Sequence, residues 1–191
     1  MKIGILISGR GSNMAAIIEA VQRGEIADSE VALVVSDKPA AAGLARSRAK
    51  GVETLVIERR GRSREEHDAE IISELKKRDV DLICLAGYMR LLSASFIRAF
   101  PNKVINIHPS LLPAYPGLNT HERVLAAGER SSGCTVHYVD EELDHGPVIL
   151  QKEVPVLPGD SPETLAARIL QQEHWLYVEA IKLLETERNK K

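Results

Sequence analysis

Short runs of β-branched and apolar residues alternate with longer amphipathic segments through the first half of the sequence. Strand-like runs occupy residues 2–7, 30–35, 53–57, 80–85 and 104–107. Between them, residues 13–23, 40–49 and 64–78 carry apolar side chains at helical spacing. Because strands that alternate with helices form a parallel, doubly wound sheet, we predict an α/β, Rossmann-like fold.

The pattern changes after Pro109. Two more strand-like runs, residues 133–139 and 148–154, flank a polar turn at residues 140–147, which predicts antiparallel strands added to the parallel sheet. Ser161 as N-cap and Pro162 at the first helical position then open a long C-terminal helix, and we expect the tail at residues 189–191 to be frayed.

Length and charge restrict the class of protein. The 191 residues fit one domain, and the net charge of −2 gives no general attraction to nucleic acid or to a membrane surface. The strand pattern begins directly after Met1, and no apolar run approaches the ~20 residues of a membrane span, so we expect a cytoplasmic protein. Cys84 and Cys134 are far apart and lack metal-ligand spacing, which predicts two buried thiols.

A glycine-bearing turn, Ile-Ser-Gly-Arg-Gly-Ser-Asn at residues 7–13, joins the first strand to the first helix. Backbone N–H groups at such a turn bind anions, most often phosphate. The turn lacks the third glycine of a dinucleotide fingerprint and the Gly-Lys-Ser/Thr ending of a P-loop, so a mononucleotide phosphate fits it better. A plain turn with Ser12 or Asn13 as N-cap is the alternative.

Asn106 and His108 stand at the end of the fifth predicted strand, and Pro109 ends it. Residues two apart in a strand share a face, and the C-terminal edge of an open α/β sheet is where ligands bind. A carboxylate such as Asp144 would favour the charged imidazole and fix its orientation. An amide and an imidazole together suit a reaction in which a carbonyl oxygen gains negative charge and a proton moves. Singly, each residue also fits a structural role: a strand cap, a buried histidine and a turn residue.

The strings that contain these residues resemble one family. They are Asn-Ile-His-Pro-Ser-Leu-Leu-Pro-Ala-Tyr-Pro-Gly at 106–117, Gly-Cys-Thr-Val-His-Tyr-Val at 133–139 and Leu-Asp-His-Gly-Pro-Val-Ile at 143–149, together with residues 7–13, 85–92 and 172–174. The sequence closely resembles the folate-dependent phosphoribosylglycinamide formyltransferases of purine biosynthesis. This resemblance implies formyl transfer from 10-formyltetrahydrofolate to the glycinamide amine, on the route to IMP, with small-molecule substrates, no metal, and either a monomer or a homodimer. It also implies one formyltransferase domain, with a nucleotide phosphate-binding half at 1–100 and a catalytic and folate-binding half at 101–191.

The resemblance assigns site residues position by position. The catalytic trio is Asn106, His108 and Asp144. The positions that match the nucleotide substrate site are Gly11, Ser12, Asn13, Leu170, Gln171, Gln172 and Glu173. The positions that match the folate pocket are Arg64, Met89, Arg90, Leu91, Leu92, Asn106, Asp140, Glu141, Glu142, Leu143 and Asp144.

Several roles stay open from the sequence. From charge alone, Arg64 is equally suited to a phosphate or to a solvated position in the first turn of its helix. His121 and His137 are each equally suited to the site and to a structural position. Asn119 stands where several family members have histidine, and His145 places a titratable group beside Asp144 where a small residue is common.

Three alternatives compete with this interpretation. A formyl-folate deformylase shares the Asn-His-Asp chemistry but has an extra N-terminal regulatory domain, whereas the strand pattern here starts at Lys2. A transfer-RNA formyltransferase has a basic C-terminal domain, whereas this sequence stops at Lys191. A non-catalytic nucleotide-binding module would use the turn at residues 7–13 alone and would leave the trio unexplained.

Overall fold

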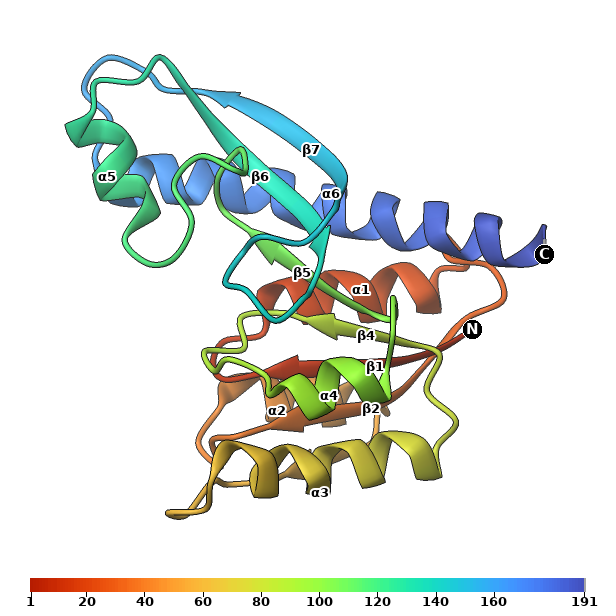
Figure 1. The fold of residues 1–191 in the computed structure, drawn as a ribbon. Helices are drawn as coiled ribbons and strands as arrows, with labels where there is room; N and C mark the ends of the chain where they lie inside the picture. The colour runs from red at the N-terminus through yellow and green to blue at the C-terminus, as the bar shows by residue number, and fades with distance from the viewer. Residues whose placement is uncertain (191) are drawn as a thin grey trace.

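The computed structural model describes residues 1–190, which form a seven-stranded sheet between two layers of helices (Figure 1). The strands are β1 (Lys2–Ile7), β2 (Glu30–Ser36), β3 (Thr54–Val56), β4 (Leu82–Leu85), β5 (Val104–His108), β6 (Ser131–Tyr138) and β7 (Val148–Pro155). Their order is β3-β2-β1-β4-β5-β6-β7. The first five strands are parallel, and β6 and β7 are antiparallel to their neighbours, as predicted.

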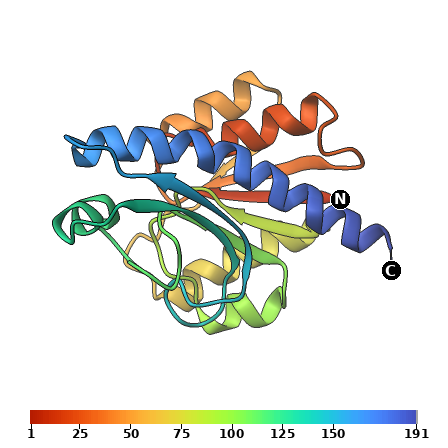
Figure 2. The same cartoon turned by 90° about the horizontal axis from the view of Figure 1, so that it is seen from above.

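Helices cover both faces of the sheet, as the view from above shows (Figure 2). The helices α1 (Ser12–Gln22), α2 (Ala42–Ala49) and α6 (Pro162–Asn189) lie on one face, and α3 (Arg64–Lys77) and α4 (Ala94–Ala99) lie on the other. A short helix, α5 (Thr120–Ala126), packs against α6. Each face has its own apolar core, with Ile17 and Ile169 in one and Ile71 and Phe96 in the other. Because both faces are covered, β1 and β4 are almost continuously apolar and buried.

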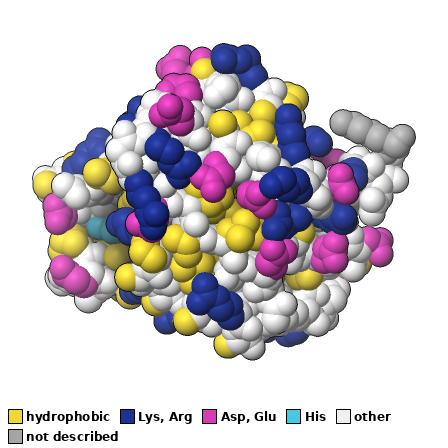
Figure 3. All heavy atoms as spheres, turned by 90° about the horizontal axis from the view of Figure 1, so that it is seen from below, with side chains coloured by type: hydrophobic (Ala, Val, Ile, Leu, Met, Phe, Trp, Pro, Cys, Tyr) yellow, Lys and Arg dark blue, Asp and Glu magenta, His cyan; other side chains and the backbone are white. Residues whose placement is uncertain are grey.

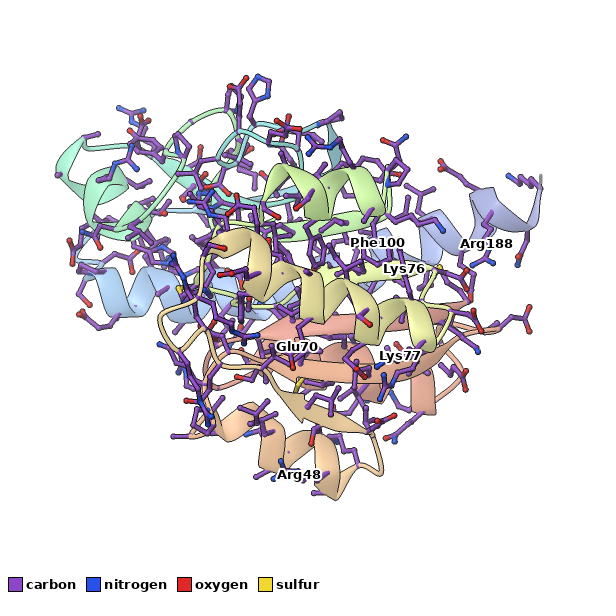
Figure 4. All side chains as sticks on the ribbon, turned by 60° about the horizontal axis from the view of Figure 1, so that its bottom comes forward. Arg48, Glu70, Lys76, Lys77, Phe100 and Arg188 are labelled. Atoms are coloured by element: carbon purple, nitrogen blue, oxygen red, sulfur yellow. The ribbon has the colours of Figure 1, made fainter. Side chains whose placement is uncertain are left out.

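The long helix α6 braces the centre of the sheet. Ser161 caps its first turn and Pro162 occupies the first helical position, as predicted. The buried Tyr177 hydroxyl lies 3.0 Å from the Leu85 carbonyl oxygen and 3.1 Å from that of Ile105, so one hydroxyl spans β4 and β5. Near the end of α6, where Figure 4 labels Arg188, the guanidinium of that residue lies 2.6 Å from the carboxylate of Asp81. The helix thus fixes the two strands whose ends carry the site.

Some local predictions were wrong. The helices α4 and α5 were not predicted, because six- and seven-residue helices give too little periodicity. Asn189 was expected to fray, yet α6 continues through it, while Lys191 lies outside the described residues. Cys84 and Cys134 are both buried free thiols, as expected. Among residues 1–190, no helix is long and apolar enough to span a membrane. Basic and acidic side chains are interspersed on the face seen from below (Figure 3).

Candidate active site

A cavity of about 710 Å³ opens at the C-terminal edge of the sheet, where β4 and β5 end. All of the residues predicted for the catalytic trio and the folate pocket contribute to its lining. They are Arg64, Met89, Arg90, Leu91, Leu92, Asn106, His108, Asp140, Glu141, Glu142, Leu143 and Asp144. The lining draws on residues on either side of residue 100, because the loop after β4 and the segments after β5 and β6 meet at this edge.

His108 is held through both ring nitrogens. Its Nδ1 lies 3.3 Å from Asp144 Oδ2, and its Nε2 lies 2.9 Å from the carbonyl oxygen of Tyr115. Both neighbours are hydrogen-bond acceptors, so a ring with hydrogens on both nitrogens satisfies both contacts. The side chain is 7% exposed, which leaves little water to compete with these contacts. The sequence indicated the Asp144 contact but gave no signal for the carbonyl of Tyr115.

The segments that hold His108 have an unusual backbone. Tyr115 has φ 54° and Asp144 has φ 50°, a left-handed conformation that non-glycine residues seldom adopt. The Gly117 N–H donates to Asp144 Oδ2 at 2.8 Å, so one carboxylate oxygen joins the loop after β5 to the loop after β6. Such strain persists where surrounding contacts maintain it, and it is concentrated at functional sites.

His137 contacts Asn106 directly. The two residues are paired opposite each other on the antiparallel strands β5 and β6. His137 Nδ1 lies 2.8 Å from the Tyr138 carbonyl oxygen, which only an N–H can satisfy, so Nε2 of the neutral ring is an acceptor. The Asn106 Nδ2 group donates to that Nε2 at 3.3 Å. Burial lowers the pKa of His137 and so favours this neutral ring.

The contact with His137 orients the amide of Asn106. Nε2 takes one amide hydrogen, the second has no partner among residues 1–190, and Asn106 lines the cavity. Asp144 Oδ1 is 3.8 Å from the same Nε2, too far for a hydrogen bond. His121 also lines the cavity. Its pKa is lowered, mainly by burial and to a smaller extent by the neighbouring His108.

Exposed apolar side chains surround the cavity. Met89, Leu91, Leu118 and Leu143 are 65%, 53%, 77% and 54% exposed, and all four line it. A group of large exposed hydrophobic side chains around one opening is typical of a ligand site, since a bound apolar ring would cover them. The loop that carries Met89 is tied to the end of β1, because the backbone N–H of Met89 donates to Ser8 Oγ at 2.9 Å.

The glycine-bearing turn lies beside this loop, and its Gly11 has φ 67° and ψ 40°. A Cβ at Gly11 would come within 3.0 Å of both the Gly43 Cα and the Met14 Cε, so a side chain there would be crowded as well as conformationally strained. Gly11 is the N-cap of α1, and no side chain among residues 1–190 caps that end. The alternative of Ser12 or Asn13 as N-cap was therefore wrong, and the first-turn N–H groups lack a side-chain partner in the described part of the chain.

Glu173 on α6 meets the start of α1. Asn13 Nδ2 donates to its Oε2 at 2.7 Å, and the residue is 8% exposed. Burial raises the pKa of Glu173, and the hydrogen bond from Asn13 partly opposes this. The glycine-bearing turn and Glu173 were both predicted to belong to the nucleotide substrate site, and in the structure they lie in contact through Asn13. Leu170, Gln171 and Gln172 precede Glu173 on the same helix, and none of them lines the cavity.

Two residues departed from the family pattern, Asn119 and His145. His145 follows Asp144 in the sequence, and its Nδ1 lies 2.9 Å from Asp140 Oδ2, a contact that raises the pKa of His145. Asn119 lines the cavity. It is the N-cap of α5 and has a left-handed backbone conformation with φ 55°. Among residues 1–190, no cluster of three or more histidine, cysteine or acidic side chains could hold a metal ion.

Comparisons with known proteins agree over almost the whole chain. A model of the formyl transferase family matches residues 1–181. A phosphoribosylglycinamide formyltransferase from Escherichia coli K12 is 47% identical over 178 residues, which is 93% of this chain and 84% of that protein. A trifunctional purine biosynthetic protein from Drosophila melanogaster is 48% identical over 185 residues, 96% of this chain, but the chain spans only 14% of its length.

Solved structures give the same result. A glycinamide ribonucleotide transformylase from Symbiobacterium toebii superposes with a TM-score of 0.96 at 48% identity, covering 98% of this chain and 89% of that one. A phosphoribosylglycinamide formyltransferase from Brucella melitensis gives a TM-score of 0.92 at 49% identity, covering 96% of this chain and 95% of that one.

Proposed function

Because this chain belongs to the formyl transferase family, we propose that it transfers the formyl group of 10-formyltetrahydrofolate to the amine of phosphoribosylglycinamide. The observation that carries the proposal is the joint placement of Asn106, His108 and Asp144 on one cavity at the sheet edge. The products are N-formyl-phosphoribosylglycinamide and tetrahydrofolate, a step of de novo purine biosynthesis.

The reaction needs an oxyanion partner and a proton path. The amine attacks the formyl carbon and forms a C–N bond, and the carbonyl oxygen becomes negative. The free N–H of Asn106 would stabilise this oxygen, and so would the Nε2–H of His108 once it exchanges the Tyr115 carbonyl for the oxyanion. Each such donor typically contributes ~2.7–4 kcal/mol. The bond to the folate nitrogen then breaks, that nitrogen gains a proton and the attacking amine loses one.

Asp144 is a positioning residue in this scheme. It holds the His108 ring at 3.3 Å and fixes its orientation, so that the ring can donate a proton directly or through a water. His137 has the corresponding role for Asn106, because it takes one amide hydrogen and thereby directs the other.

The two substrates would approach from different sides. The nucleotide phosphate fits the uncapped start of α1 at Gly11, Ser12 and Asn13, and Glu173 receives the glycinamide end. The folate ring fits the cavity beneath the exposed apolar rim, and loop residues 140–144 supply backbone groups to its polar edge. A single domain, with the phosphate turn in residues 1–100 and the trio in 101–191, is part of this proposal, as is a cytoplasmic location.

An acceptor-competition assay tests the function. The purified protein, given 10-formyltetrahydrofolate, should formylate phosphoribosylglycinamide and release tetrahydrofolate in a 1:1 ratio. Water and methionyl-tRNA serve as rival acceptors, which correspond to the deformylase and transfer-RNA alternatives. Tetrahydrofolate release that is unchanged when phosphoribosylglycinamide is omitted would favour hydrolysis, and no turnover with any acceptor would favour a nucleotide-binding module.

A further inference from the structure

The loop after β4 carries four residues of the proposed folate pocket, Met89, Arg90, Leu91 and Leu92. Apolar packing holds this loop only in part, because the side chains of Met89 and Leu91 are more than half exposed. The backbone N–H and carbonyl groups of residues 90–92 form no hydrogen bond with another residue of 1–190. They are therefore available to a ligand in the cavity, on the condition that the loop is held in place.

Two hydrogen bonds hold this free stretch of backbone, one at each end. At the first end, the N–H of Met89 donates to Ser8 Oγ at 2.9 Å. At the second end, the N–H of Ser93 donates to Asp68 Oδ2 on α3 at 2.6 Å. Both acceptors are buried side chains, and they come from different elements of the fold. The position of residues 90–92 thus depends on these two contacts.

Asp68 is the more unusual of the two acceptors. It is 1% exposed, and the N–H of Ser93 is its one hydrogen-bond donor among residues 1–190. His67 Nδ1 is 3.6 Å from Asp68 Oδ1, which is too long for a hydrogen bond. The other ring nitrogen of His67 lies 2.7 Å from the carbonyl oxygen of Ile57. A buried carboxylate with so few partners is costly, and such a cost is expected where a site requires it.

The packing of α3 on α4 does not need this carboxylate. The two helices lie against each other, and Ile71 and Phe96 belong to the same apolar core (Figure 1). The Oγ of Ser93 separately caps α4 by accepting from the N–H of Phe96 at 3.2 Å. What Asp68 adds is a fixed position for Ser93, the residue at which the loop after β4 ends.

We propose that Asp68 is a positioning residue for the folate co-substrate, which fixes the end of the loop after β4 so that the free backbone groups of residues 90–92 stay in place to meet the folate ring. The inference rests on the proposed function. Asp68 does not line the cavity, so it acts through Ser93 and not by contact with the ligand.

The size of the effect follows from the kind of hydrogen bond. Without its acceptor, the N–H of Ser93 is buried and unpaired, and the loop moves to satisfy it. Asp68→Ala should therefore weaken folate binding by about tenfold, which is comparable with the net contribution of one hydrogen bond to a charged group. Asp68→Asn keeps the shape and a neutral acceptor. Because a charge-assisted hydrogen bond is roughly twice as strong as a neutral one, this variant should lose about threefold.

The test compares the two substrates. Calorimetry measures the dissociation constants of tetrahydrofolate and of phosphoribosylglycinamide, and steady-state kinetics give kcat and the KM for 10-formyltetrahydrofolate. Folate affinity should fall from the wild type to Asp68→Asn and again to Asp68→Ala, while the affinity for phosphoribosylglycinamide stays unchanged. The KM for the folate should rise by more than kcat falls, because the ligand is bound less well but meets the same catalytic groups.

Glu185 provides a matched control. It is a buried carboxylate on α6, and it accepts from the backbone N–H of Ala27 at 3.1 Å, in the turn between α1 and β2. Glu185→Ala removes a contact of the same kind from a turn that does not line the cavity. It should lower the melting temperature and leave both dissociation constants unchanged.

Different outcomes separate this inference from the proposed function. If the Asp68 variants melt at lower temperature but bind tetrahydrofolate as the wild type does, Asp68 is only structural, and the inference is wrong while the function stands. Equal losses of affinity for both substrates would also overturn it. If Asp68→Ala does not fold, Asp68→Asn decides by the same criteria. A wild type that binds phosphoribosylglycinamide but not tetrahydrofolate would overturn the proposed function, and the inference with it.

Discussion

At the scale of single residues, the proposed reaction depends on a pair of hydrogen-bond donors at the end of β5, Asn106 and His108. Replacing His108 with alanine should lower turnover by ~10²–10³ without unfolding the protein, because it removes an oxyanion partner and a proton donor. Asn106→Ala should cause a comparable loss. Because both act on one oxygen, the double variant should lose less than the product of the two single losses. Steady-state kinetics with thermal melts provide the measurement, and strictly multiplicative losses would mean that the two side chains act on different atoms.

The contact between Asn106 and His137 gives a prediction that does not depend on turnover. With asparagine present, the His137 ring should titrate below the 6.5 of an ordinary histidine, because burial disfavours its charged form. Asn106→Asp would place a carboxylate where the amide now contacts Nε2 at 3.3 Å, so the titration should move to higher pH.

Nuclear magnetic resonance of the ring nitrogens can follow this titration, and it also reports whether Nδ1 carries the hydrogen in the wild type. Asn106→Ala is the control for simple loss of the side chain, and it should give a much smaller rise than the aspartate variant. Equal titrations in Asn106→Asp and the wild type would mean that the two side chains are not in contact in solution.

At the scale of elements, the sequence predicted what depends on local patterns and missed what depends on register. The strands and the longer helices were predictable because their apolar spacing is local. The pairing of Asn106 with His137 was not, because it requires the antiparallel register of β5 against β6. The carbonyl of Tyr115 contacts His108 from a residue in the left-handed backbone conformation. A tyrosine in the sequence does not predict that conformation, because non-glycine residues seldom adopt it.

The turn between β1 and α1 supplies the prediction at this scale. Gly11→Val should weaken phosphoribosylglycinamide binding far more than folate binding, because the side chain would crowd both the phosphate position and Gly43. A non-glycine residue at φ 67° also costs ~1–3 kcal/mol of stability. Calorimetry on the folded variant, with each substrate separately, measures the two affinities.

Gly9 offers a matched control within the same turn. A Cβ at Gly9 meets no atom within 4 Å, and its φ is not in the left-handed region, so Gly9→Ala should be tolerated in the fold. If Gly11→Val left nucleotide affinity intact and abolished folate binding, the two substrates would be assigned to the wrong sides of the site.

At the scale of the whole molecule, α6 connects the stability of the fold to the proposed nucleotide substrate site. It packs on the core of one face, spans β4 and β5 through Tyr177, and buries Glu173 against α1. A carboxylate that is 8% exposed and has one hydrogen-bond donor is a costly feature in a helix that otherwise stabilises the sheet. Such a feature is expected where binding requires it.

The stability of the protein should therefore depend on the protonation of Glu173. Burial raises the pKa of Glu173 in the folded protein above the 4.5 of an ordinary glutamate. Below pH 4.5 the side chain is neutral in both the folded and the unfolded protein, and its burial costs no charge. As the pH rises through the folded pKa, the buried side chain becomes charged and the folded protein loses stability. Glu173→Gln keeps an acceptor for Asn13 without the charge, so it should melt at a higher temperature than the wild type at pH 8. The difference should shrink as pH falls towards 4.5, where both carry a neutral side chain.

The control is Glu179, which is partly exposed on the same helix, and Glu179→Gln should show no such gain in melting temperature at pH 8. The same Glu173→Gln change should weaken phosphoribosylglycinamide binding, since the charge is the proposed contact with the glycinamide end. A Glu173→Gln protein that is less stable than the wild type by the same amount at every pH would show that the buried charge is not the cause.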